Sequence, residues 1–145
     1  MKKLVVFDFN RTLFDPDKGR LIDGALELLE KLKTAGHFLI LLGKAPRERG
    51  ELIKELGIEK YFNKIILKDE KTIEDFKTAK KLVPPDSYAY AVGDRIKKEI
   101  LLANLAGFKT IWFKNGRYAV EEPSTEDEQP WMTINSLNEL YNLVS

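Results

Sequence analysis

Short apolar segments rich in β-branched and aromatic residues alternate along this chain with longer amphipathic segments. The apolar segments have the length and composition of buried strands, and the segments between them have the periodicity of helices that bury one face. This alternation predicts an α/β fold with parallel strands and crossover helices, a three-layer α/β/α, Rossmann-like, doubly wound sheet of about five strands. The expected strands span residues 3–9, 38–42, 64–67, 88–92 and 109–113.

Capping and helix-breaking residues mark the expected helix ends. Asp23 is a suitable N-cap for a first helix that ends at Gly36. A second helix is expected over 46–56, a third from near residue 72 to the prolines at 84 and 85, and a fourth over 96–106. Residues 115–130 are predicted to form an acidic, solvated loop, followed by a short strand at 131–135 and a helix at 136–144.

Composition narrows the class of protein. A length of 145 residues suits a single domain, 1–145, with a core of its own. Basic and acidic residues nearly balance, 24 against 23, which disfavours general nucleic-acid binding. The chain has no cysteine, which excludes disulfides and thiolate chemistry. We expect a cytoplasmic protein that does not enter membranes, and the abundance of Lys and Glu is typical of a thermophile.

Polar residues directly follow three of the expected strands. Asp8 lies at the carboxyl end of the first strand and Asn10 follows it, Gly43 and Lys44 follow the second strand, and Asp94 follows the fourth. Any one of them could be a cap or a turn residue. In open α/β sheets, however, ligands bind beyond the carboxyl ends of the strands. The combination therefore predicts one binding site at that edge of the sheet.

Two of these segments resemble motifs of the haloacid dehalogenase (HAD) superfamily of phosphohydrolases, DxDxT and GDxxxD or GDxxxxD. FDFNRTLFD matches the first motif at Asp8 and Thr12, and AVGDRIKKEI matches the last one at Asp94 and Glu99. The following segment, ANLAGFKTIWF, also fits, so the resemblance covers nearly the whole chain. It implies the strand order 5-4-1-2-3. Neither interval in which family members carry a cap domain has room for one, which implies a capless or minimal-cap type.

The resemblance also implies a chemistry. Asp8 would attack phosphorus to form an aspartyl-phosphate. Magnesium would be held by Asp8, Asp94 and the backbone carbonyl of Asn10, because this ion prefers oxygen ligands. Glu99 would lie outside the ligand set and act on the site by contacting these ligands or through a water molecule; the alternative is a charge on an exposed helix face.

A lysine of the family lies between the nucleophile and the phosphate. Lys71, before the third expected helix, is the candidate, and Lys68 is the alternative. Further contacts to the phosphate or substrate are expected from Arg11, Thr12, Gly43 and Lys44.

Two positions depart from the family pattern. Asn10 stands where family phosphatases have the acid that protonates the leaving oxygen and then activates water, and an amide cannot do either. Gly43 replaces a Ser or Thr and offers only its backbone N–H, with Lys44 nearby as a compensating cation. We therefore predict a magnesium-dependent phosphohydrolase with altered acid–base chemistry. The alternative is an impaired relative that binds metal, phosphate or a protein partner.

Two further points concern partners and class. An uncapped site suits a large or macromolecular phosphorylated substrate, or a homodimer in which a neighbour serves as the lid. A two-component receiver domain has a similar fold, but its acceptor Asp would end the third strand, and Asp69 comes one residue late. We therefore disfavour the receiver interpretation.

Overall fold

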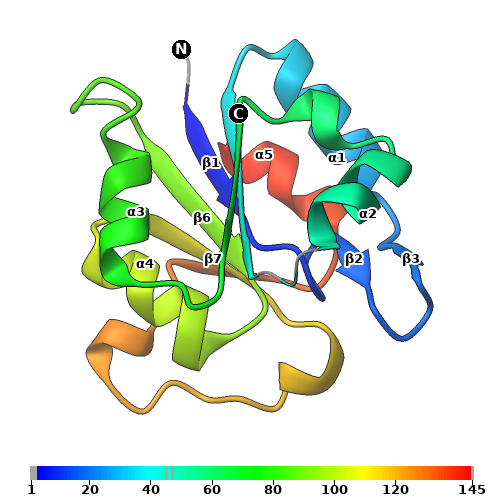
Figure 1. The fold of residues 1–145 in the computed structure, drawn as a ribbon. Helices are drawn as coiled ribbons and strands as arrows, with labels where there is room; N and C mark the ends of the chain where they lie inside the picture. The colour runs from blue at the N-terminus through cyan, green and yellow to red at the C-terminus, as the bar shows by residue number, and fades with distance from the viewer. Residues whose placement is uncertain (1–2, 45, 47, 145) are drawn as a thin grey trace.

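A six-stranded parallel sheet forms the centre of the molecule in a computed structural model that describes residues 3–44, 46 and 48–144 (Figure 1). The strand order is β5-β4-β1-β6-β7-β8, which confirms the predicted class and order and adds β8 at one edge. The sheet is therefore one strand larger than five, because the short segment predicted at 131–135 pairs with β7. The strands are β1 (Leu4–Phe7), β4 (Phe38–Lys44), β5 (Lys64–Lys68), β6 (Ala89–Gly93), β7 (Lys109–Phe113) and β8 (Met132–Ile134).

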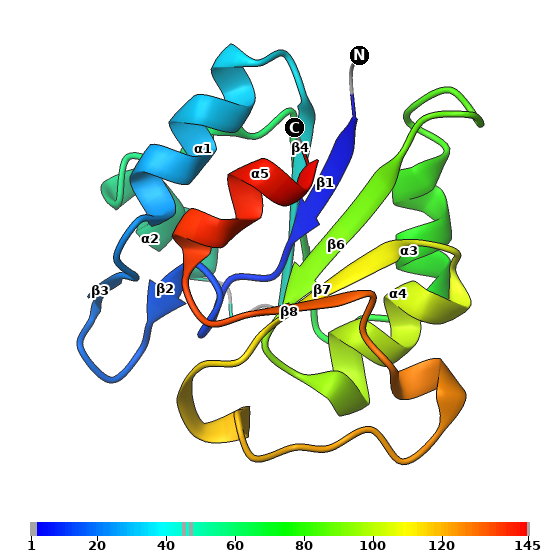
Figure 2. The same ribbon diagram turned by 180° about the vertical axis from the view of Figure 1, so that it is seen from behind.

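Helices cover both faces of this sheet (Figures 1 and 2). On one side lie α1 (Ala25–Thr34), α2 (Arg49–Glu55) and α5 (Leu140–Val144), and on the other α3 (Ile73–Lys80) and α4 (Leu101–Leu105). Successive residues of β1 therefore enter different cores: Val5 and Phe7 pack toward α1, and Leu4 and Val6 toward α3. Burial on both faces explains why the central strands are apolar throughout.

Several helix ends differ from the predictions. The first helix begins at Ala25, and its N-cap is Gly24 rather than Asp23, because the chain there takes a φ of 86° that glycine tolerates. The second begins at Arg49 rather than at residue 46, and residue 47 of its expected start lies outside the described part. The start of α3 is as predicted: Thr72 and Asp75 form a reciprocal capping box.

Shorter helical turns complete the structure. The expected fourth helix is divided into a π-helix, η2 (Ile96–Ile100), and α4. The 3₁₀ turns are η1 (Glu59–Tyr61), η3 (Gly116–Tyr118), η4 (Glu126–Glu128) and η5 (Leu137–Glu139). None of the described helices is long and apolar enough to cross a membrane.

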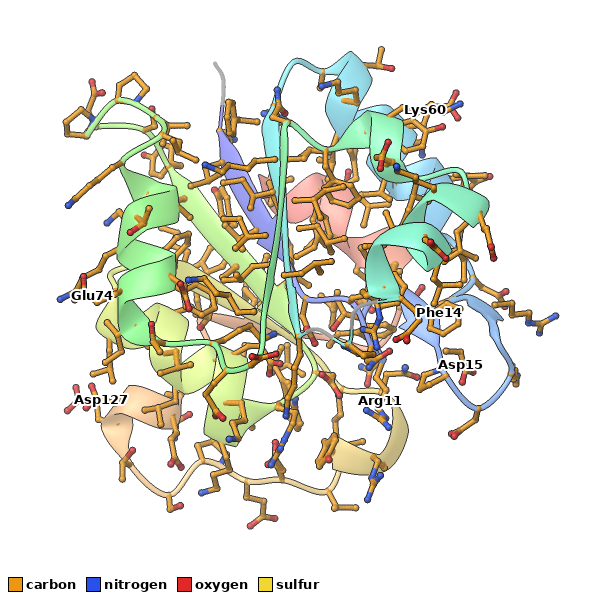
Figure 3. All side chains as sticks on the ribbon, in the orientation of Figure 1. Arg11, Phe14, Asp15, Lys60, Glu74 and Asp127 are labelled. Atoms are coloured by element: carbon orange, nitrogen blue, oxygen red, sulfur yellow. The ribbon has the colours of Figure 1, made fainter. Side chains whose placement is uncertain are left out.

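A small hairpin lies between β1 and α1. It consists of β2 (Phe14–Asp15) and β3 (Arg20–Leu21), which pair antiparallel. The turn before it is tight, since the N–H groups of Leu13 and Phe14 both donate to the carbonyl of Phe9, and Arg11 takes a φ of 61°. Arg11 lies at the end of the sheet beside this hairpin (Figure 3). The hairpin thus fixes the loop that follows Asp8.

Candidate active site

The carboxyl ends of β1, β4 and β6 meet at a cavity of about 260 Å³. Its lining is highly charged, with six basic and four acidic side chains. The basic ones are Arg11, Lys44, Arg49, Lys71, Arg95 and Lys98, and the acidic ones are Asp8, Glu70, Asp94 and Glu99. Such a lining suits a charged ligand rather than an apolar one.

Asp8 follows β1 directly and is 8% exposed. Its N–H donates to the carbonyl of Val92 on the neighbouring strand over 3.0 Å, which fixes the backbone at the end of the sheet. The ammonium of Lys71 donates to Asp8 Oδ1 at 2.7 Å and to Glu99 Oε1 at 3.0 Å. Burial lowers the pKa of Lys71, but the charges of Asp8 and Glu99 outweigh this and raise it above its ordinary value. Lys71 is therefore a permanent cation between two carboxylates.

Lys68 lies elsewhere. Its side chain is 51% exposed and pairs with Asp75 at 3.4 Å, in the capping box of α3. Of the two candidate lysines, Lys71 is the one beside Asp8.

Three buried carboxylates gather beside Lys71. Asp8, Asp94 and Glu99 each offer an oxygen within 4.8 Å of the other two. Burial, followed by the charge of Asp8, raises the pKa of Asp94 to about 9 and that of Glu99 to about 7. Asp94 Oδ2 and Glu99 Oε2 are buried without a hydrogen-bond partner. Concentrated negative charge with free oxygen atoms fits a hard divalent cation such as magnesium.

Local structure explains how these side chains come together. Asp94 follows β6, and its carbonyl accepts a hydrogen bond of 2.9 Å from the indole of Trp112 on β7. In the π-helix the N–H of Ile100 donates to the carbonyl of Arg95, five residues back, and Glu99 is thereby brought against Gly93. A π-helical turn of this kind is frequent at functional sites.

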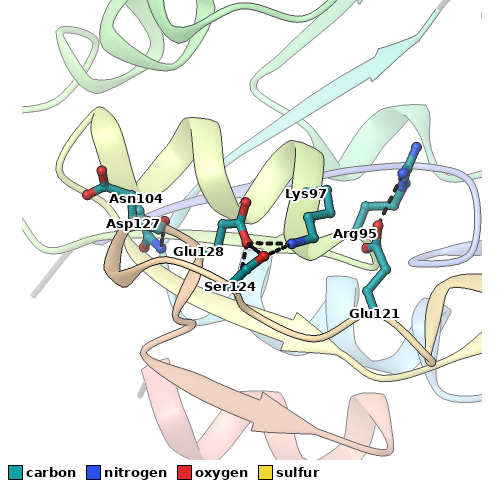
Figure 4. Close-up of polar contacts among 7 residues, drawn as sticks. All are labelled: Arg95, Lys97, Asn104, Glu121, Ser124, Asp127 and Glu128. Atoms are coloured by element: carbon teal, nitrogen blue, oxygen red, sulfur yellow. Dashed lines mark hydrogen bonds and ion pairs between the residues drawn. The ribbon is translucent and has the colours of Figure 1, made fainter.

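A second cluster contains Arg11, Arg95 and Tyr118. The guanidinium carbons of Arg95 and Arg11 lie 4.0 Å and 5.4 Å from the centre of the Tyr118 ring. Glu121 Oε2 accepts from Arg95 at 3.1 Å, while Arg95 Nε is buried without a partner (Figure 4). Gly116 leaves room for the Arg11 side chain, because a Cβ there would lie 3.2 Å from Arg11 Cδ.

The loop that carries Tyr118 is not the freely solvated flap that its composition predicts. Lys97 pairs with Glu128 at 2.7 Å and also contacts Ser124, and Asn104 donates to the carbonyl of Asp127 at 2.7 Å (Figure 4). These contacts hold the loop against η2 and α4, and two of its acidic residues, Glu121 and Glu128, pair with Arg95 and Lys97.

The structure brings most of the predicted site residues together. Those that line the cavity are Asp8, Asn10, Arg11, Lys44, Lys71, Asp94 and Glu99. Thr12 is fully buried, with a hydroxyl that has no partner, and Gly43 lies within β4; neither lines the cavity.

Sequence reasoning did not single out six lining residues, Arg49, Glu70, Arg95, Lys98, Leu102 and Tyr118. Arg95 and Lys98 stand inside the last motif, so their position was a usable signal. Tyr118 had none, because its loop is placed by contacts distant in sequence.

Comparison with known proteins agrees with this geometry. Residues 74–140 match a family described as HAD-hydrolase-like. Proteins from Methanopyrus kandleri and Pyrococcus furiosus, both named glyceraldehyde 3-phosphate phosphatase, are 33% identical over 125 and 108 residues, or 80% and 69% of this chain. The chain belongs to the HAD superfamily. It spans about half the length of these HAD relatives, 53% and 45%.

Solved HAD structures share the fold over nearly all of both chains. YfnB from Bacillus subtilis, described as a HAD-hydrolase bound to magnesium, superposes with a TM-score of 0.81 at 16% identity and 99% coverage of each chain. A 2-haloacid dehalogenase from Pseudomonas syringae superposes with a TM-score of 0.79 at 15% identity, with 99% of this chain and 98% of that chain covered. A D,D-heptose 1,7-bisphosphate phosphatase from B. bronchiseptica gives 0.73 at 13% identity, with 97% and 99% covered. Since a dehalogenase and a phosphatase share it, the fold alone does not determine the reaction.

Proposed function

We propose that this protein is a magnesium-dependent phosphohydrolase in which Asp8 attacks phosphorus to form an aspartyl-phosphate. The observation that carries the proposal is the position of Lys71, 2.7 Å from Asp8 and 3.0 Å from Glu99 at the edge of the carboxylate cluster. A carboxylate that attacks a phosphate dianion meets strong repulsion, so fixed positive charge at this position lowers the barrier.

The residues have distinct roles in this proposal. Asp8 is the nucleophile, and Lys71 neutralises charge without transferring its proton. Arg11 and Lys44, which line the cavity, contact the substrate and its phosphoryl oxygens, whereas Gly43 and Thr12 have no direct contact with it. Magnesium, when bound by Asp8, Asp94 and the Asn10 carbonyl with Glu99 around them, neutralises part of the phosphate charge.

Three further features bear on the substrate. The relatives named glyceraldehyde 3-phosphate phosphatase support a small phosphorylated molecule. Between β1 and α1 the chain has only the β2–β3 hairpin, so the cavity stays open, which supports a single capless domain and leaves room for a large substrate or a second subunit. Asn10 supports altered acid–base chemistry. If this change abolishes turnover altogether, the protein would bind metal and phosphate without hydrolysing a substrate.

The test is hydrolysis of para-nitrophenyl phosphate with magnesium or with a chelator, by wild type, Asp8→Asn and Lys71→Met. We expect magnesium-dependent turnover that Asp8→Asn abolishes and Lys71→Met lowers by about 100-fold or more. Lys68→Met is the matched control and should retain the wild-type rate. Acid-stable trapping of phosphate on Asp8, read by peptide mass, tests the intermediate. Turnover that survives Asp8→Asn would reject the proposal.

A further inference from the structure

Among the described residues that line the cavity, one carboxyl group lies outside the cluster that we assign to magnesium, and it does not lie at position 10, where family phosphatases have their acid. Asn10, two residues after Asp8, lines the cavity, and its amide cannot transfer a proton. Among the described lining residues, Glu70 is the one carboxylate outside the Asp8, Asp94 and Glu99 cluster. Its side chain is 73% exposed and pairs with Lys98 at 3.7 Å. An alkoxide leaving group is strongly basic and needs such a proton, so an alkyl phosphate ester is poorly served here.

The same cavity has more positive charge than one phosphoryl group needs. Apart from Lys71, five basic side chains line it. Arg11 has no acidic partner within salt-bridge distance among residues 3–44, 46 and 48–144, and its guanidinium lies over Tyr118 next to that of Arg95. The backbone of Arg11 is held in the left-handed region, and Asn115 Nδ2 donates to its carbonyl at 3.3 Å. Fixed guanidinium groups of this kind recognise oxyanions.

We propose that the substrate of this site is a phosphoryl compound whose leaving group departs as an anion without a proton, namely a phosphoanhydride or an acyl phosphate. This inference rests on the proposed function and specifies its substrate class. Because Asn10 cannot protonate the leaving oxygen, the site can work well only on substrates whose leaving oxygen is weakly basic and needs no proton. Arg11 and Arg95 then stabilise the negative charge that the departing group gains.

The steps balance without a proton donor. An Asp8 oxygen forms the new bond to phosphorus, the bond from phosphorus to the leaving oxygen breaks, and its electron pair remains on the departing carboxylate or phosphate. Water then attacks the same phosphorus, and the bond to Asp8 breaks with its electron pair on the regenerated carboxylate. Both protons of the water remain on the released phosphate, which loses one to solvent at neutral pH.

The test compares kcat/KM of wild type for acetyl phosphate, pyrophosphate, para-nitrophenyl phosphate, phenyl phosphate and glycerol phosphate. We expect a steep decline with rising basicity of the leaving group, with glycerol phosphate at least about 100-fold below the best anhydride. Asn10→Asp should flatten the series by raising the rates for phenyl and glycerol phosphate. Glycerol phosphate turned over as fast as acetyl phosphate and pyrophosphate would overturn the inference while leaving the phosphohydrolase intact. No turnover of any compound would overturn both.

Arginine variants separate the two anhydride sources. If the leaving group is a phosphate, Arg11→Ala and Arg95→Ala should raise KM for pyrophosphate about tenfold and raise KM for acetyl phosphate less, because a departing acetate has a smaller negative charge than a departing phosphate. If acetyl phosphate alone is turned over, an acyl phosphate is the substrate class. Arg117→Ala is the control, since Arg117 also lies over Tyr118, at 5.3 Å, but does not line the cavity. Equal effects of Arg11→Ala and Arg117→Ala would overturn the assignment of Arg11 to the leaving group.

Discussion

The side chain of Glu99 packs directly on the α-carbon of Gly93, so closely that a Cβ at Gly93 would lie 2.8 Å from Glu99 Cβ. The last strand residue before Asp94 must therefore be glycine if the π-helix is to bring Glu99 to Lys71. In the GDxxxxD-like motif of this chain, the glycine is thus required by the close approach of Glu99, the acid five residues after Asp94.

The first prediction concerns this contact. Gly93→Ala should displace Glu99 and weaken its pairing with Lys71, since the close atoms include the first carbons of the side chain. We expect about 1–3 kcal/mol lower stability and weaker magnesium binding, measured by chemical denaturation and titration calorimetry. Gly50→Ala in α2 is the control, because nothing lies within 4 Å of its added methyl group. Equal effects of the two substitutions would contradict this account.

A second prediction concerns the repulsion among the three carboxylates. Burial and the neighbouring charge of Asp8 raise the pKa of Asp94, so the ionised form is disfavoured in the folded protein. Asp94→Asn should therefore raise the melting temperature in a chelator, and it should also remove the increase that magnesium gives the wild type. Differential scanning calorimetry with and without magnesium measures both. A variant that is less stable in chelator and still responds to magnesium would show that Asp94 is not a ligand.

The pH dependence gives a third prediction. The unfolded chain loses these carboxyl protons near its ordinary values, whereas the folded pKa is about 7 for Glu99 and about 9 for Asp94. The folded state thus binds more protons at neutral pH, and in chelator its stability should fall as pH rises toward 9. Magnesium competes with these protons, so its apparent affinity should rise over the same interval. If the magnesium affinity did not change between pH 7 and pH 9, the assignment of Asp94 and Glu99 to the magnesium site would be wrong.

A fourth prediction follows from Asn10 in the second half of the reaction. Because the amide cannot take a proton from water, hydrolysis of the aspartyl-phosphate should be slower than its formation from a reactive ester. Stopped-flow mixing with para-nitrophenyl phosphate should then show a burst of nitrophenolate close to one equivalent per site, followed by slow turnover. Asn10→Asp should abolish the burst and speed up the steady state. A linear trace from wild type would show that attack on the substrate limits the rate.

The sequence was sufficient for the sheet and for much of the cavity. Buried strands are apolar on both faces, and polar residues just after them, such as Asp8 and Asp94, must lie at one edge once the strands are parallel. The start of α3 near residue 72 was also predicted correctly, because the capping box of Thr72 and Asp75 is a local feature.

What the sequence did not reveal depends on contacts between distant residues. Asp23 is a good cap by type, but the backbone turn at Gly24 determines where α1 begins. The π-helix spans only five residues, which are too few for the pattern of apolar positions to distinguish it from an α-helix. Tyr118 reaches the cavity because Lys97 and Glu128 hold its loop, and no local pattern encodes an ion pair across 31 positions.

The register of β1 has a consequence for how the molecule folds. Leu4 pairs with Phe38 on β4 on one side and with Ala89 on β6 on the other, so the strand before Asp8 is completed only by a strand from the second half of the chain. Closing that long loop is entropically costly and slow, and it must precede any approach of Asp8 to Asp94. A chain emerging from the ribosome therefore has no carboxylate cluster until β6 is synthesised, and nascent chains halted before that strand should not respond to magnesium.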